Sequence, residues 1–126
     1  MSSGIIPKDW VLLWENSNPS NAFAEQTVNI NLTDYQYVAI QFMEETTPTV
    51  PYIFPVIIGK NTFASLDRVW ASSGGKGGGG VYQRYFTFTN GGISFDGCRS
   101  LAFNSWDYST TDNNHMKPHK IFGVKI

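Results

Sequence analysis

Short apolar stretches, separated by polar turns, run along the whole chain. In residues 26–32, Val28, Ile30 and Leu32 alternate with threonine and asparagine, which predicts a strand with one buried face. No segment holds the helical repeat of apolar residues over three turns, so we expect little or no helix. Strand-forming composition predicts further strands over residues 10–15, 35–43, 52–59, 66–71, 81–89, 93–95, 99–103 and 119–126.

Turn residues indicate how some of these strands connect. Asn90-Gly91 lies between two apolar runs and is typical of a tight β-hairpin. Thr33-Asp34 predicts a turn that makes either a hairpin or a corner. The run 52–59 is apolar on both faces and suggests a strand deep between layers. Its Pro55 cannot donate to a ladder, however, and therefore belongs at an edge or a bulge.

Composition and length favour one all-β domain. Aromatic residues make up 15% of the chain, and its 12 glycines and many polar turn residues suit short strands. A length of 126 residues fits a single domain. We therefore predict one antiparallel β-sandwich over residues 1–126, jelly-roll-like or of another Greek-key topology. An N-terminal arm at 1–9 and a long polar loop at 104–118 would accompany it.

Residues 72–80, SSGGKGGGG, hold six of the 12 glycines. A phosphate-binding loop needs a hydroxyl residue after Gly-Lys and a helix behind it. Here Gly77 follows Lys76, and a strand-like segment begins at Val81. The strand-like sequence on each side is too short to fold alone, which argues against an interdomain linker. We expect a glycine-rich surface loop that joins two strands of one domain.

Charge and cysteine content exclude several classes of protein. The formal net charge is −1 and no basic run occurs, so we expect no nucleic-acid binding. Cys98 is the only cysteine, so no intrachain disulfide can form, which fits folding in a reducing cytosol. The sequence shows neither a signal peptide nor an apolar stretch of membrane-spanning length. We expect synthesis in the cytoplasm and no membrane insertion.

Candidate metal ligands occur near the C-terminus. His115 and His119 lie four positions apart, but Pro118 disfavours the helix that would place both on one face. A loop that leads into the last strand is the favoured interpretation. Asp107, Asp112, Asn113 and Asn114 offer oxygen ligands for calcium, but their spacing differs from that of an EF-hand, so solvated turn residues are favoured. We predict no metal and no cofactor.

Catalytic patterns are equally sparse. No nucleophile elbow is present, and neither histidine has an evident nucleophile as partner. We interpret Glu44-Glu45 as solvated surface, because a glycosidase needs its two carboxylates on separate elements. Cys98 could be activated by the adjacent Arg99, but a buried, inert thiol is the commoner case. We predict a protein that is not an enzyme.

Aromatic residues beside polar ones give the remaining signal. Trp106-Asp107-Tyr108 lies in the longest polar loop, and Trp70 and Tyr82 flank the glycine run. Flat rings stack on sugar faces while aspartate accepts hydrogen bonds from hydroxyls, so these five residues are candidate glycan contacts. The alternative is that the rings only cap the ends of the sandwich core.

Both ends of the chain carry short motifs in a characteristic order. They are Trp10-Val11-Leu12-Leu13-Trp14-Glu15-Asn16, Phe23-Ala24, Gln26-Thr27-Val28, Leu32-Thr33-Asp34-Tyr35, Arg84-Tyr85-Phe86-Thr87-Phe88, Gly92-Ile93-Ser94-Phe95 and Lys120-Ile121-Phe122-Gly123-Val124-Lys125. This order resembles a module of minor structural and tail-associated proteins of phages and prophages of Gram-positive bacteria. Residues 44–80 are largely outside the match, and no catalytic residue transfers with it.

The resemblance implies a non-enzymatic virion protein, associated with the tail or a fibre, with contact to host-surface glycans as a further expectation. Such components usually act as symmetric oligomers, so we expect a homo-oligomer, a trimer by preference, together with other virion proteins as partners. The chain would then reside in the virion. One alternative is a free-standing carbohydrate-binding, lectin-like module of a bacterium. A small glycan-cleaving enzyme would require two carboxylates close together in a cleft.

Overall fold

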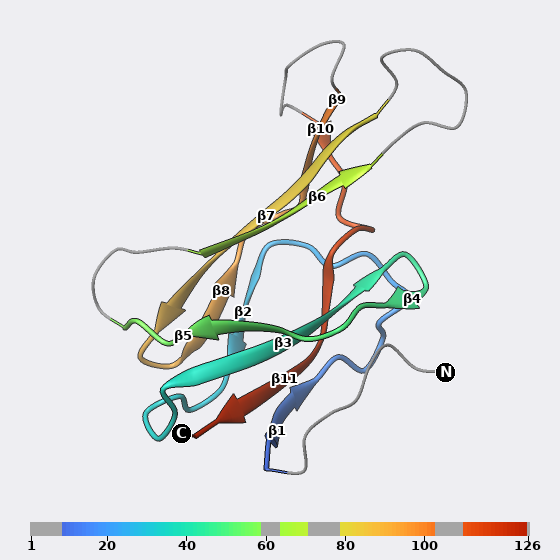
Figure 1. The fold of residues 1–126 in the computed structure, drawn as a ribbon. Helices are drawn as coiled ribbons and strands as arrows, with labels where there is room; N and C mark the ends of the chain where they lie inside the picture. Colours follow the sequence, from blue (N-terminus) through green and yellow to red (C-terminus); the bar gives the residue numbers. More distant parts are fainter. Residues whose placement is uncertain (1–8, 59–63, 71–78, 103–109, 126) are drawn as a thin grey trace.

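The structure is a computed structural model that describes residues 9–58, 64–70, 79–102 and 110–125 (Figure 1). Within these ranges it contains strands and no helix, hence no helix that could span a membrane, and two antiparallel sheets pack together. The predicted all-β sandwich is confirmed. The strands are β1 (Val11–Glu15), β2 (Gln26–Asn29), β3 (Tyr37–Glu44), β4 (Thr47–Pro48), β5 (Tyr52–Pro55), β6 (Ala64–Trp70), β7 (Gly80–Thr89), β8 (Gly92–Phe95), β9 (Arg99–Ala102), β10 (Thr110–Thr111) and β11 (Lys117–Val124).

Each sheet is built around one long strand. In the first, called here the β3 sheet, the order is β1-β11-β3, and both β4 and β5 pair with the other edge of β3. In the second, the β7 sheet, β6 pairs with one edge of β7, while β9 and β8 share the other edge and carry β10 and β2 outside them. The last strand of the chain therefore lies between β1 and β3. The pairing of β11 with β1 and β3 thus joins the C-terminal end of the chain to its N-terminal part within one sheet.

Phe86 lies at the centre of the core, with no exposed surface. Its ring contacts Phe54 of the opposite sheet edge-on at 4.9 Å and Phe42 at 6.4 Å between centroids. Within its own sheet it contacts Phe88 at 5.9 Å and Phe95 at 5.4 Å. This cluster of rings joins the two layers, since aromatic pairs at these separations add to the gain from apolar burial.

Two hairpins follow the turn chemistry of the sequence. Asn90-Gly91 joins β7 to β8, whose flanking residues Thr89 and Gly92 are cross-strand partners, as predicted. Gly92 has φ +153°, and a Cβ there would overlap the carbonyl oxygen of Val28, so only glycine fits. The glycine-rich segment connects β6 to β7, which pair antiparallel up to Trp70 and Gly80. A strand therefore follows it in place of the helix that a phosphate loop requires.

The turn at Thr33-Asp34 is a corner, one of its two predicted alternatives, because β2 belongs to the β7 sheet and β3 to the β3 sheet. Two other expectations need correction. The described part of the segment predicted at 52–59 does not lie deep between layers: β5 is an edge strand, and Ile53 is 55% exposed. Pro55 stands at this edge as predicted, where a missing N–H costs no ladder bond.

The predicted polar loop at 104–118 is also wrong in part. Residues 103–109 lie outside the described residues, but Thr110–Thr111 form β10 against β9, and β11 already begins at Lys117. Lys117 is fully buried because its ammonium group donates to the Glu45 carbonyl at 2.6 Å and to Asn114 Oδ1 at 3.1 Å. Local composition could not indicate this burial, because the main acceptor comes from a turn 72 residues away.

Candidate functional site

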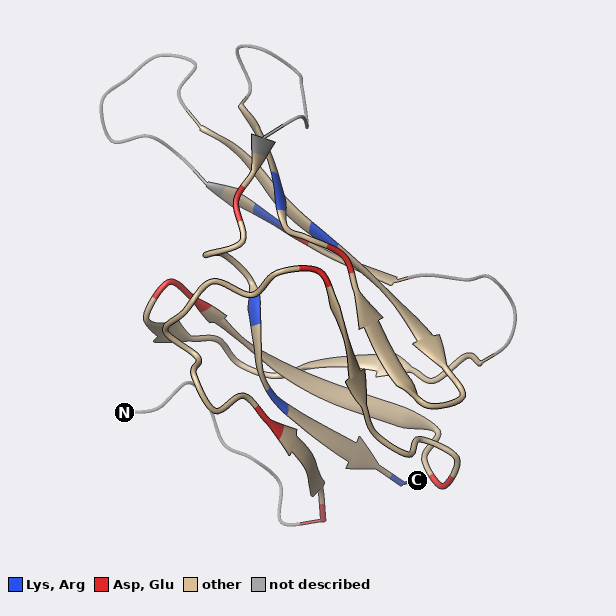
Figure 2. Cartoon of the chain, turned by 180° about the vertical axis from the view of Figure 1, so that it is seen from behind, with Lys and Arg blue, Asp and Glu red and all other residues tan. Residues whose placement is uncertain are grey.

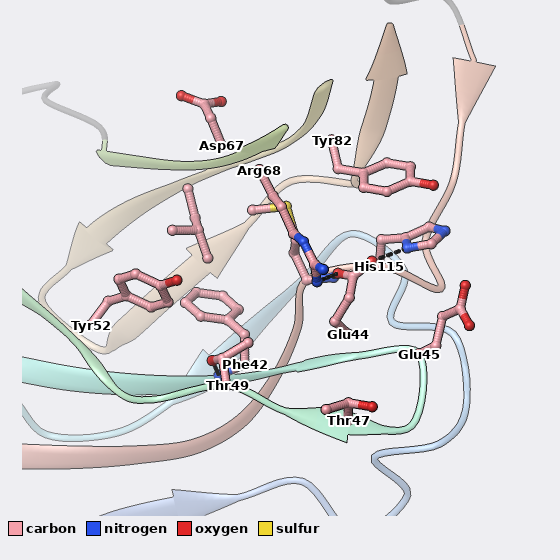
Figure 3. A pocket seen from close by; sticks show the side chains of 12 residues that line it. Phe42, Glu44, Glu45, Thr47, Thr49, Tyr52, Asp67, Arg68, Tyr82 and His115 are labelled. Atoms are coloured by element: carbon pink, nitrogen blue, oxygen red, sulfur yellow. Dashed lines mark hydrogen bonds and ion pairs between the residues drawn. The ribbon is translucent and has the colours of Figure 1, made fainter. Parts of the chain in front are cut away.

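A cleft of about 640 Å³ opens between the two sheets, beside β4, β5 and β6 (Figure 3). Figure 1 shows the β6–β7 pair extending away from the β3 sheet on this side. The cleft combines aromatic, aliphatic and charged side chains from both layers and from the loop before β11. Its lining residues are Phe42, Glu44, Glu45, Thr47, Thr49, Tyr52, Leu66, Asp67, Arg68, Tyr82, His115 and Met116.

One wall of the cleft is aromatic. Tyr52, at the start of β5, is 41% exposed, and its ring lies 6.3 Å from the buried ring of Phe42 at a 60° tilt. Period-two alternation places Tyr52 and Phe54 on the inner face of β5 and Ile53 on the outer one. Phe54 packs in the core against Phe86. Tyr52, two residues earlier on the same face of β5, borders the cleft instead. A flat, accessible ring therefore borders the cleft.

Glu44 is the polar centre of the cleft, with its side chain only 12% exposed. Its Oε1 makes a short contact with Nδ1 of His115, and its Oε2 accepts a hydrogen bond from the Met116 amide at 2.9 Å. Arg68 of β6 approaches the same Oε2 with Nη1 at 3.7 Å, which makes an ion pair between the two sheets. The interpretation of Glu44 as solvated surface is therefore wrong, because its partners come from the distant residues 115 and 116.

His115 is held on both ring nitrogens. Besides the Glu44 contact, its Nε2 lies 3.4 Å from Oδ2 of Asp112. The imidazole stacks on the ring of Tyr82 with 3.7 Å between centroids and 12° between planes. Because each nitrogen faces a carboxylate, the ring is held in one orientation from both sides. The arrangement suits a fixed wall of a binding cleft.

A backbone turn and a buried arginine fix the position of His115. Met116 has φ +49°, which turns the chain sharply just before β11. Arg84, fully buried in β7, donates to the carbonyl oxygens of His115 at 3.1 Å and Met116 at 3.0 Å. It also donates to the carbonyls of Phe23 at 3.0 Å and Asp96 at 2.7 Å. One guanidinium thereby fixes three chain segments, and burial lowers the pKa of Arg84 to about 10.

Burial also shifts nearby groups. The pKa of the Tyr82 hydroxyl is raised by desolvation and by the carboxylates of Asp112 and Glu44. The pKa of Lys117 is lowered by desolvation, against the opposing effect of Glu44. Burial raises the pKa of Cys98 to about 11, so the thiol stays neutral at physiological pH. The predicted buried thiol is confirmed, and activation by Arg99 is not indicated.

The loop oxygens that suggested calcium are used within the protein. Asp112 faces His115, Asn113 Oδ1 accepts from the Cys98 amide at 2.8 Å, and Asn114 Oδ1 accepts from Lys117. No group of three or more histidine, cysteine, aspartate or glutamate side chains in the described ranges could hold a metal ion. Asp107 is outside those ranges.

The predicted glycan contacts are only partly placed. Tyr82 lines the cleft and stacks on His115. Trp70 ends β6, but its side chain lies outside the described residues, as do Trp106, Asp107 and Tyr108 entirely. The cleft instead brings in residues that the sequence did not single out as contacts, chiefly Glu44, Tyr52, Arg68 and His115. The period-two relation of Glu44 to Phe42 was the one local signal that Glu44 points inward.

Lysine and arginine positions are distributed over both sheets, with aspartate and glutamate positions among them (Figure 2). No protein family model, no curated protein and no solved structure matches this chain. The resemblance to phage tail-associated modules therefore stays a prediction from the sequence.

Proposed function

We propose that this chain is a non-catalytic β-sandwich module that binds a saccharide in the cleft between its sheets. The observation that carries the proposal is the lining of the cleft, where the accessible ring of Tyr52 faces a space bordered by Arg68, Glu44 and threonines. Saccharides present a flat apolar face beside many hydroxyl groups, and a ring next to fixed polar groups is complementary to both.

We further propose, from the resemblance of the chain ends, that the module acts in a phage or prophage virion as a tail- or fibre-associated protein. The saccharide would then belong to the surface of the host cell. A rigid sandwich that presents a cleft at one edge suits this role, because binding sites are commonly carried by an ordered β scaffold. A trimer or another homo-oligomer would cover exposed apolar residues of β1 and of the segments that flank β5, namely Val11, Leu12, Val50 and Ile57.

A non-catalytic role fits the state of the carboxylates. The cleft does contain Glu44 and Glu45, which a glycan-cleaving enzyme would need near one another. Glu44 has both oxygens engaged, by His115 and by the Met116 amide, so neither is free to protonate a leaving group. Glu45 is exposed on a turn with φ +54°. A pair of this kind serves better as a hydrogen-bonding wall than as an acid and a nucleophile.

The test of saccharide binding compares two neighbours on β5. Tyr52→Ala removes the ring from the cleft, whereas Ile53→Ala removes a similar apolar side chain from the opposite face. Binding to isolated host cell walls and to a glycan array should weaken roughly three- to tenfold in Tyr52→Ala, the value expected for one aromatic stack. Ile53→Ala should bind like the parent chain. Equal binding by all three proteins would refute the role of the cleft.

The virion role has its own test. Mass spectrometry of particles induced from a strain that encodes the chain should detect it in stoichiometric amount, and light scattering should give the mass of an oligomer. A monomer that is absent from particles yet still binds saccharide would instead identify the alternative, a free-standing carbohydrate-binding module of a bacterium.

A further inference from the structure

The guanidinium of Arg68 makes one long ion pair and is otherwise accessible. It stands in β6 at the mouth of the cleft, with its side chain 51% exposed. Its contact with Glu44 is 3.7 Å long, beyond hydrogen-bonding distance, and Arg68 donates no hydrogen bond to any residue in the described ranges. A guanidinium has five N–H donors in a planar fork. Figure 3 shows the guanidinium above Glu44 at the border of the cleft, and its half-exposed side chain leaves donors for a ligand there.

Glu44 does not depend on Arg68 for its own hydrogen bonds. Oε1 is engaged by His115, and Oε2 accepts from the Met116 amide at 2.9 Å. If Arg68 turns toward another anion, both oxygens of Glu44 keep a partner. The cost of exchanging the ion pair is therefore low, because a partly exposed pair at this distance contributes little to stability.

Asp67 and Glu45 also line the cleft, but their carboxylates point away from the space between Tyr52 and Arg68. In Figure 3, Asp67 points out of the cleft on the far side of β6, where it accepts a hydrogen bond from the Ser65 hydroxyl at 3.3 Å. Glu45 lies beyond Glu44, on the side away from Tyr52. A ligand between the Tyr52 ring and Arg68 would thus meet one cation, with Glu44 as the single facing carboxylate.

We propose that the ligand of the cleft is an acidic saccharide, a sugar unit that carries a carboxylate or a phosphate. Its anion pairs with the fork of Arg68, and its ring lies against Tyr52. Planar guanidinium donors match the two oxygens of a carboxylate or phosphate, which a neutral hydroxyl cannot do. This inference rests on the proposed saccharide binding and names the chemistry that selects the ligand.

The experiment measures binding of matched acidic and neutral sugars by chemical-shift titration. Tetragalacturonate is compared with its fully methyl-esterified form, which has the same rings without charge, and glucose 6-phosphate is compared with glucose. In the parent chain, at least one acidic form should bind roughly ten- to a hundredfold more tightly than its neutral partner, the range of a charge-assisted contact. The ratio should shrink with added salt. The pair that shows it identifies carboxylate or phosphate as the source.

Three variants assign the effect. Arg68→Gln should abolish the preference, so that the acidic form binds no more tightly than its neutral partner. Asp67→Asn alters a neighbouring charge that faces away from the cleft, and should keep the preference. Arg68→Lys keeps the charge without the fork and should retain only part of it.

The outcomes separate the inference from the proposed function. Equal affinity for both forms in the parent chain, with binding still lost in Tyr52→Ala, would overturn the acidic ligand but leave saccharide binding intact. A preference that survives Arg68→Gln would overturn the assignment to Arg68. No binding of any of these sugars or of the host cell wall would refute both proposals.

Discussion

Replacing Arg84 by methionine should be the most damaging single change outside the apolar core. The side chain has no exposed surface, and its guanidinium donates to four backbone carbonyls at 2.7–3.1 Å. These carbonyls belong to Phe23, Asp96, His115 and Met116, which lie in three separate segments. Methionine matches the length of the stem and removes every donor. Four carbonyls would lose a partner inside the protein.

The expected loss can be estimated from these contacts. A buried carbonyl left without a partner costs about 1–3 kcal/mol, but such costs are not additive, because the loosened segments admit water. The variant also regains the desolvation free energy of a buried cation, which the lowered pKa of about 10 reveals. Removing one side of a buried charged network typically costs about 3–5 kcal/mol. We expect the free energy of unfolding to fall by that amount.

Urea denaturation followed by tryptophan fluorescence measures this loss. With ordinary values of the denaturant slope, the midpoint should fall by roughly 2 M. Arg84→Lys should lie between the parent and Arg84→Met, since one ammonium cannot reach all four carbonyls. Arg68→Gln serves as the matched control on an exposed arginine and should change stability by less than about 0.5 kcal/mol. If Arg84→Met remains within about 1 kcal/mol of the parent, the guanidinium does not hold these segments together.

Three further predictions follow from particular contacts. Gly92→Ala should lower the free energy of unfolding by more than about 2 kcal/mol, because at φ +153° its Cβ would overlap the Val28 carbonyl. Gly91→Ala has open space around it and should lower the free energy of unfolding by less than about 1 kcal/mol. Equal effects of the two variants in urea denaturation would contradict the turn geometry. Burial raises the pKa of Cys98 from 9.0 to about 11, so the thiol ionises first in the unfolded state as the pH rises. The stability that Cys98 contributes is therefore complete below pH 9 and is lost between about pH 9 and 11. Cys98→Ala should make this loss smaller, and equal slopes of stability against pH in the two proteins would contradict the prediction. The parent chain should show no hydrolysis of saccharides that it binds, by reducing-end assay, and turnover that disappears in Glu44→Gln would overturn the non-catalytic proposal.

The fold class and much of the strand pattern were readable in the sequence because they depend on local periodicity. Alternation in 26–32 buries Val28 and Leu32, as expected from residues spaced by two on one face. Asn90-Gly91 marks the hairpin turn in the sequence, although in the structure the positive φ lies at the next residue, Gly92. Such features require no knowledge of distant partners.

The cleft, in contrast, was decided by tertiary structure. Glu44 and His115 are 71 positions apart, and no local pattern relates them until β3 and β11 pair. In the sequence, Arg84 looks like an ordinary polar residue of an alternating strand. It can be buried because four carbonyl oxygens from other segments accept hydrogen bonds from its guanidinium. Likewise, the apolar run at 52–59 is an edge because of its place in the sheet order. Local propensity specifies strands and turns, whereas the pairing of distant segments determines which polar groups meet, because hydrogen bonding and desolvation depend on neighbours in space.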